Sequence, residues 1–301
     1  MSLKNQCKSA FICVQLQLLG NIILKISPNI QCDTTDFWRA DAISNEICRN
    51  LQNKNKCYTL KKMTKIVSIP DSYRYKFANI PAKLFPYFDS LLKKPSGNSQ
   101  FHLAMNHHPE KTFEVLDRQF SACSKIVSLS PDDLLKKLDF QSKDLSPERI
   151  ESLLGELRTI HFLDNNGFTN ITPIRANSTK SPDFSAEKNG DNFLIEVVTS
   201  IYFAPRNFHN TIVKWAISRL QNDDKLSQMN TGSAIYKNLF VCILNSLGAV
   251  ALNKRSDYLI MLKEIWEKVG SIQNLYIAIV TGKTTIDEGL DDCVYPSFDR
   301  V

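Results

Sequence analysis

The chain has 301 residues, of which 43% are hydrophobic, 23% charged and 10% aromatic, enough apolar side chains to bury a sizeable core. This composition excludes a disordered protein, and the 10 Gly and 12 Pro are too few for collagen-like or Gly-rich repeat architectures. The net charge of +6 is uneven: residues 1–142 hold 20 Lys and Arg against 12 Asp and Glu, whereas residues 143–301 hold 17 against 19. The imbalance predicts a front region that holds a polyanion, the alternative being a chance excess of solvated lysines.

The eight cysteines form no C-x-x-C pair and no cluster at zinc-ligand spacing. Cysteines without such a pattern behave as small apolar residues in a reducing cytosol, so we expect a cytoplasmic protein. The longest apolar stretch, residues 10–26, is interrupted by glutamine, asparagine and lysine, which argues against a membrane span. Apolar and polar residues alternate on both sides of Gly20-Asn21, and this pattern predicts a β-hairpin with one buried face.

The rest of the front half has mainly helical patterns. Helices are expected near residues 40–52, 110–122 and 131–139, and the last two begin close to Pro109 and Pro131, which suit a first helical turn. A polar segment then precedes the capped start of another helix at residue 147. We therefore expect a mainly helical, basic domain over residues 1–142, containing the β-hairpin, and a second domain over residues 143–301.

In the second domain the pattern alternates between helices and strands. A first helix over residues 148–165 carries an apolar stripe on one face. Strands are expected at 169–175, 182–187, 192–199, 238–245 and 274–280, with further helices at 208–221 and 256–268. This order predicts an α/β domain with a mixed sheet flanked by helices.

The Asn189-Gly190 pair between two strand patterns is the clearest turn signal in the chain. Both central positions of a two-residue type I′ turn need a positive φ, which Asn and Gly adopt readily. If this pair is the turn, residue 188 pairs with residue 191 and Asp183 lies opposite Glu196. The alternation then places an apolar set on the core face, made up of Phe184, Ala186, Phe193 and Ile195.

Asp183 and Glu196 would then project together from the other face of the ribbon. Directly opposed side chains lie about 5 Å apart, and like charges at that distance destabilise a sheet. A divalent cation bound by oxygen ligands is the natural compensation. Glu156 on the preceding helix can bring a third carboxylate to the pair, with Glu151, about one and a half turns earlier, as its competitor.

These residues resemble the PD-(D/E)xK nuclease superfamily, which has the restriction-endonuclease-like fold. The family pattern is a helix with an acidic residue, Pro-Asp on one strand, and an acidic residue followed two positions later by Lys on the next. Glu156, Pro182-Asp183 and Glu196 match it in order, type and spacing, over roughly residues 147–245. The resemblance implies a Mg²⁺ site, which Mn²⁺ can also fill, formed by Asp183, Glu196 and the backbone carbonyl of Val197, with Glu156 completing it.

The chain departs from the family pattern at the lysine. Two residues after Glu196 stands Val198, where a lysine would orient or activate the attacking water. Lys214 on the following helix and Lys180 before the first strand are the available substitutes. We rank Lys214 first, because a regular strand turns Lys180 away from the face of Asp183.

Residues 53–76 form a basic segment with interleaved tyrosines. Cations neutralise phosphates and aromatic rings stack on exposed bases, so the segment is typical of nucleic-acid contact, although a solvated basic face has the same composition. Its cations are Lys54, Lys56, Lys61, Lys62, Lys65, Arg74 and Lys76.

The sequence thus predicts a metal-dependent endonuclease that hydrolyses phosphodiester bonds of DNA and has no membrane contact. DNA is favoured over RNA because the resemblance implies it, and the two-part architecture suggests a role in restriction or defence and allows a homodimer. The alternative is a catalytically inactive nucleic-acid-binding protein with the same fold, which Val198 favours. A third interpretation is an interaction protein whose carboxylates are surface groups.

Overall fold

The computed structural model describes residues 68–93, 100–174, 181–200, 207–222, 229, 235–244, 255–270, 272, 274–281 and 291–298. All of them belong to one compact unit, Lys65–Val301, while the other unit is Met1–Thr64. The β-hairpin predicted within residues 10–26 and the helix predicted near 40–52 therefore lie outside the described residues.

The first described part is helical, as predicted for the front of the chain. Its helices are α3 (Ser72–Lys76), α4 (Leu84–Lys93), α5 (Gln100–His107), α6 (Pro109–Ile126) and α7 (Pro131–Lys137). Helices α6 and α7 confirm the two that were predicted here. At the start of α7 the Ser130 hydroxyl accepts a hydrogen bond from the Asp133 N–H at 3.1 Å, which caps the helix. Helices α3, α4 and α5 were not predicted.

The second part alternates between helices and strands and confirms the predicted order. Its elements are α8 (Pro147–Asn165), β1 (Thr169–Pro173), β2 (Phe184–Lys188), β3 (Asp191–Ser200), α9 (Phe208–Asn222), β4 (Tyr236–Leu244), α12 (Arg255–Lys268), β5 (Leu275–Thr281) and β6 (Asp291–Tyr295). The sheet order is β1-β2-β3-β4-β5-β6. Strand β3 pairs with β4 and β4 with β5 in parallel, and the other neighbouring pairs are antiparallel, so the sheet is mixed.

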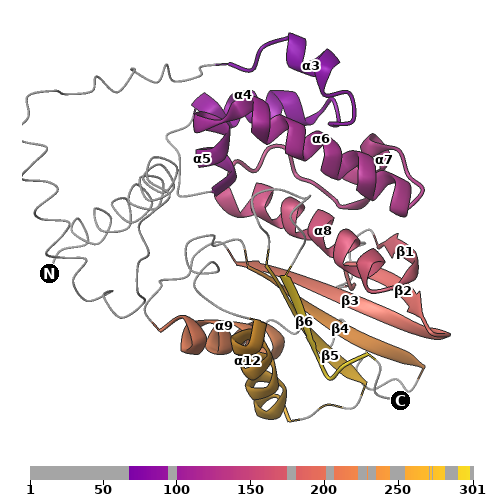
Figure 1. Ribbon diagram of the computed structural model, residues 1–301. Helices are drawn as coiled ribbons and strands as arrows, with labels where there is room; N and C mark the ends of the chain where they lie inside the picture. Colours follow the sequence, from indigo (N-terminus) through magenta and orange to yellow (C-terminus); the bar gives the residue numbers. More distant parts are fainter. Residues whose placement is uncertain are drawn as a thin grey trace, which may run out of the picture. The chain divides into compact units, whose positions relative to one another are not determined.

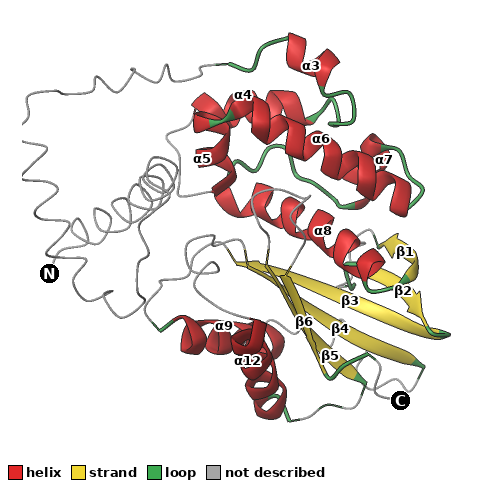
Figure 2. Cartoon of the chain, viewed as in Figure 1, coloured by secondary structure: helices red, strands yellow, loops and turns green. Residues whose placement is uncertain are grey.

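Helices cover both faces of this sheet (Figures 1 and 2). Helix α8 packs on one face, and helices α9 and α12 pack on the other. Side chains of β3 alternate between two apolar cores: Ile195 belongs to the core under α8, whereas Val198 belongs to the core under α9 and α12. The residues at even and odd positions of β3 therefore face different helices, and Glu196 shares its face with Val198.

The core under α8 extends into the helical layer, which is formed by helices α4, α5, α6 and α7. Phe85 of α4 and Phe113 of α6 belong to the same cluster of buried side chains as Ile150 and Leu157 of α8. The predicted boundary between residues 142 and 143 falls in the loop between α7 and α8, and apolar packing continues across it. The division of function between the two regions stays a prediction. None of the described helices is long and apolar enough to span a membrane.

Helix α8 lies close to the sheet at Gly155. A Cβ atom added to Gly155 would stand 2.2 Å from the Thr199 Oγ1 and 3.5 Å from the Ile243 Cγ1. Real Cβ atoms do not approach a neighbour to 2.2 Å, so any side chain here would have to push the helix away from β3. The glycine costs helix stability but lets α8 carry Glu156 close to the sheet.

Gly155→Val should therefore destabilise the protein by roughly 2–3 kcal/mol, the usual cost of overpacking a dense core. The measurement is the free energy of unfolding in denaturant. Ser152→Val on the same helix is the control, because it adds a β-branched residue to α8 without that contact. If the two variants lost the same stability, the close approach of α8 to Thr199 would be contradicted.

Candidate active site

The turn of the β2–β3 hairpin has the conformation that the sequence predicted. Asn189 and Gly190 have φ values of 53° and 84°, both in the left-handed region that a type I′ turn requires. Lys188 pairs with Asp191 and Phe184 with Ile195, which confirms the predicted register. The apolar face of the ribbon is confirmed too, since its predicted residues all belong to the core under α8.

Asp183 stands directly before β2, so the paired ladder begins one residue after it. Its N–H donates to the Ile195 carbonyl at 2.9 Å, and its carbonyl accepts from the Ile174 N–H at 2.8 Å. The Oδ2 atom of Asp183 accepts from the Val197 N–H at 2.7 Å. The backbone hydrogen bonds thus fix the aspartate. Its carboxylate contacts β3 at Val197, the residue that follows Glu196.

Glu196 lies inside the fold: only 1% of it is exposed. Its neighbour on β4 is Phe240, a member of the core under α9 and α12. Val198, on the same face, is 7% exposed and belongs to that core together with Ile212 and Val213 of α9. The position where the resemblance implies a lysine is therefore an apolar packing position in this chain.

Glu156 lies on α8, and its Oε2 atom is enclosed with no hydrogen-bond partner among the described residues. Burial raises the pKa of Glu156 well above its usual range, and the charge of Asp183 is the next largest cause. Arg149 acts in the opposite direction, and Glu196 raises the pKa by a smaller amount. The charges of Asp183 and Glu196 therefore both reach Glu156.

Glu151, the competitor of Glu156, has a structural role. It is 2% exposed, and its Oε1 atom accepts a hydrogen bond from the Phe101 N–H at 3.0 Å, at the start of α5. A carboxylate at a helix N-terminus satisfies an N–H group that the helix itself leaves unpaired. The charge of Asp183 acts on Glu156, whereas the Glu151 carboxylate is bound at the start of α5, so Glu156 is the better candidate for the site.

The donor chemistry of the three carboxylates fits a hard divalent cation, which prefers oxygen ligands. The enclosed Oε2 of Glu156 is an atom that a cation would satisfy. Within the described part of the chain, however, no three His, Cys, Asp or Glu side chains are grouped closely enough to hold a metal ion as placed. The three carboxylates therefore have the oxygen donors that a divalent cation prefers. Their side chains would have to move closer together to bind it.

Of the two candidate lysines, the structure describes only Lys214. Lys214 is exposed on α9, on the side of the sheet that Glu196 and Val198 face. Lys180 lies outside the described residues. Sequence reasoning overlooked Arg149, whose charge acts on Glu156 more strongly than that of Glu196 does. Its position on the same helix face as a carboxylate, at i and i+7, was the available signal.

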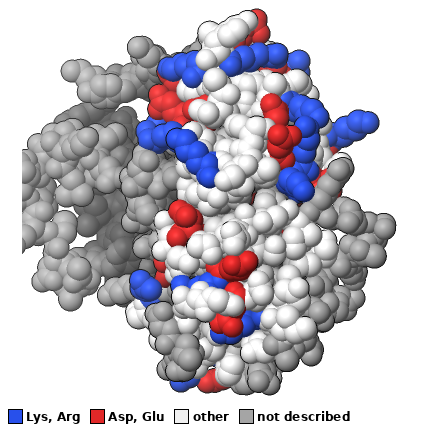
Figure 3. Space-filling model, turned by 90° about the vertical axis from the view of Figure 1, so that its right-hand side faces the viewer, with Lys and Arg blue, Asp and Glu red and all other residues white. Residues whose placement is uncertain are grey.

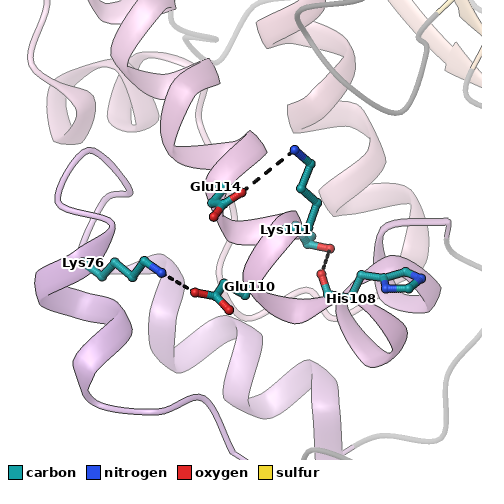
Figure 4. Close-up of polar contacts among 6 residues, drawn as sticks. Lys76, His108, Glu110, Lys111 and Glu114 are labelled. Atoms are coloured by element: carbon teal, nitrogen blue, oxygen red, sulfur yellow. Dashed lines mark hydrogen bonds and ion pairs between the residues drawn. The ribbon is translucent and has the colours of Figure 1, made fainter.

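The basic segment is described only at its end, where both cations contact the helical layer. Lys76 forms an ion pair with Glu110 of α6 (Figure 4) and lies 5.4 Å from the centre of the Phe77 ring. The Arg74 guanidinium lies 5.7 Å from the centre of the Phe85 ring. Both side chains stay exposed, so these contacts leave them accessible to a partner. Lys54, Lys56, Lys61, Lys62 and Lys65 lie outside the described residues.

The described surface shows mixed charge around the helical layer. On the face seen in Figure 3, acidic and basic side chains lie next to one another over the upper part, and the described residues form no large area of one sign. Near Lys76, the pair Lys111 and Glu114 has an N–O distance of 4.0 Å (Figure 4). Exposed pairs of this kind contribute little stability, since water and salt screen them.

A mixed six-stranded sheet with helices on both faces and a helical region before it defines the fold. No family model matches the chain, and a search of curated proteins found no match. Among solved structures it shows a weak resemblance to the restriction endonuclease FokI bound to DNA, with a TM-score of 0.21 and 11% sequence identity. The match covers 64% of this chain and 29% of the other, so the chain spans less than a third of that protein.

Proposed function

We propose that the chain is a metal-dependent endonuclease that hydrolyses phosphodiester bonds of DNA. The observation that carries the proposal is the pair of carboxylates Asp183 and Glu196 on the β2–β3 ribbon, whose charges both act on Glu156 of α8. Asp183 is bound to the Val197 N–H beside the buried Glu196, and both carboxylates act on the enclosed Glu156. Like charges brought together inside a fold are costly unless a cation or protons neutralise them.

Each residue has a distinct role in this proposal. Asp183, Glu196 and the Val197 carbonyl are the groups that would hold Mg²⁺, or Mn²⁺ in its place, and Glu156 would complete the site. A metal ion held there would supply Lewis-acid chemistry, namely a lower pKa for a water and polarisation of the scissile phosphate. The Val197 N–H orients the Asp183 carboxylate through its 2.7 Å hydrogen bond. Lys214 is the proposed amine that orients the attacking water.

The wider context of the proposal comes from the charge distribution. The basic region over residues 1–142 would hold DNA through its lysines while the domain over residues 143–301 cuts it. A cytoplasmic role in restriction or defence, and a homodimer, belong to the same proposal.

A second function is supported by Val198. A residue that is 7% exposed and packed in an apolar core leaves the usual place of the lysine without a cation. A protein that keeps the fold and binds nucleic acid without cutting it would have this feature. The two functions make the same prediction for DNA affinity and opposite predictions for cleavage.

The test is to measure metal-dependent stability and cleavage on the same preparation. Mg²⁺ and Mn²⁺ should each raise the melting temperature of the full chain, because a ligand that binds only the folded state stabilises it. Plasmid DNA should be cut when either ion is added and stay intact in EDTA. A metal-dependent rise in melting temperature with intact plasmid would favour the binding protein, and the absence of both effects would contradict a metal site.

A further inference from the structure

Arg149 lies on α8 seven residues before Glu156. Seven residues are nearly two full turns, so the two side chains leave the same face of the helix, about 10 Å apart along its axis. Helical side chains all lean toward the N-terminus, so Arg149 and Glu156 incline alike and this spacing is kept. The helix thus places an arginine on the same face as Glu156, nearly two turns before it.

The Arg149 side chain is held by residues of the loop between α7 and α8. Its Nη2 donates a hydrogen bond to the Asp139 carbonyl, and its guanidinium lies 5.2 Å from the centre of the Phe140 ring. Phe140 in turn packs edge to face against Tyr87 of α4, with ring centres 5.0 Å apart. The cation is therefore positioned by a carbonyl and a pair of packed rings.

The hydrogen bond to Asp139 uses one N–H donor of the guanidinium. The guanidinium carries five N–H donors, and its Nε is buried without a hydrogen-bond partner among the described residues. None of the ion pairs between described residues joins Arg149 to a carboxylate. Its charge nevertheless reaches Glu156, whose pKa it lowers. An arginine with a purely structural role would be expected to donate its N–H groups to acceptors inside the fold.

We propose that Arg149 binds a phosphate group of DNA next to the three carboxylates, an inference that rests on the proposed function. Asp183, Glu196 and Glu156 repel a phosphodiester, so a fixed cation is needed to hold it there. The planar fork of a guanidinium matches two phosphate oxygens at once. Val198 supplies no charge on its strand, and Arg149, on the same face of α8 as Glu156, is a cation whose side chain is held in place by Asp139 and Phe140.

The test measures the affinity of the full chain for a short DNA duplex in EDTA, by fluorescence anisotropy over a range of salt concentrations. Arg149→Met keeps much of the apolar stem and removes the charge. It should weaken binding about tenfold or more, the effect of one charge-assisted hydrogen-bonded contact. The slope of log affinity against log salt should become shallower by about 0.9, as for one lost phosphate contact. Arg149→Lys should keep the slope and lose only part of the affinity.

Arg255→Met is the matched control, since Arg255 is an exposed arginine at the start of α12, on the other side of the sheet. It should leave affinity and slope unchanged. The melting temperature of each variant is measured in parallel, because a purely structural role of Arg149 would lower it without changing the slope. That result would overturn the inference.

The design separates this inference from the proposed function. If the wild type binds the duplex and Arg149→Met binds it with the same affinity and slope, Arg149 makes no phosphate contact and the nuclease proposal still stands. A wild-type chain that binds no DNA overturns the proposed function and the inference with it. A shallower slope for Arg149→Met together with an unchanged slope for Arg255→Met supports the phosphate contact.

Discussion

Asp183→Asn and Glu196→Gln should each lower the rate of DNA cleavage by at least about a thousandfold, the several kcal/mol that a bound metal ion contributes to the transition state. Each change removes one negative oxygen ligand and nearly preserves the shape of the side chain. The Asp183 carboxylate accepts from the Val197 N–H at 2.7 Å, and an amide oxygen can accept the same bond. Loss of the metal, and not loss of the local fold, should then be the cause.

Affinity for DNA should stay the same or increase in both variants, because a carboxylate that repels the phosphate is removed. Cleavage is measured at saturating enzyme, and affinity is measured separately in EDTA. Glu187→Gln is the control: Glu187 is exposed on β2, on the same face as Asp183 but at the turn end of the hairpin. Unchanged cleavage by both site variants would end the assignment of the active site to this ribbon.

Local signals explain which parts of the fold could be predicted. The Asn189-Gly190 turn sets the register of the whole hairpin, so the pairing of Phe184 with Ile195 follows from two residues. Pro131 and the Ser130 cap mark the start of α7 in the same local way. Helix α4 was missed because Pro86 lies within its first turn and its sequence is crowded with aromatic residues, which weaken the helical pattern.

The parts that escaped prediction depend on contacts between distant residues. Strand β6 is five residues long and is stabilised by antiparallel pairing with β5. No local sequence pattern indicates this pairing. Likewise, the carboxylate of Asp183 turns to the Val197 N–H because the ladder begins only at Phe184. The position of Arg149 depends on Phe140, which packs against the helical layer. Tertiary packing decides these placements.

Lys214→Ala should lower the cleavage rate by about a hundredfold, the usual contribution of one positioned acid or base. Lys214 is exposed on α9, whose buried residues Ile212 and Val213 pack in the same core as Val198. The helix therefore carries the amine on the side of the sheet that Glu196 faces. Because the side chain is exposed, the melting temperature should change little. Lys263→Ala, at an exposed lysine of α12, is the control and should cut at the wild-type rate.

Val198→Lys is the reciprocal change, and its effects on stability and on cleavage should be opposite. At 7% exposure the new ammonium would enter an apolar core, which costs several kcal/mol if it stays unpaired. Glu196, two residues earlier on the same face, offers a carboxylate that reduces this cost. We therefore expect a lower melting temperature together with faster cleavage than the wild type, measured at a temperature where the variant is fully folded.

The two variants together distinguish the two candidate functions. A wild-type chain that cuts slowly, loses about a hundredfold with Lys214→Ala and gains rate with Val198→Lys would be a nuclease whose amine has moved from β3 to α9. Cleavage that does not change in Lys214→Ala would leave the carboxylate site standing and exclude this lysine as the amine. If the wild type is inert with Mg²⁺ and Mn²⁺ and only Val198→Lys cuts, the apolar residue on β3 is what separates a DNA-binding protein from an enzyme.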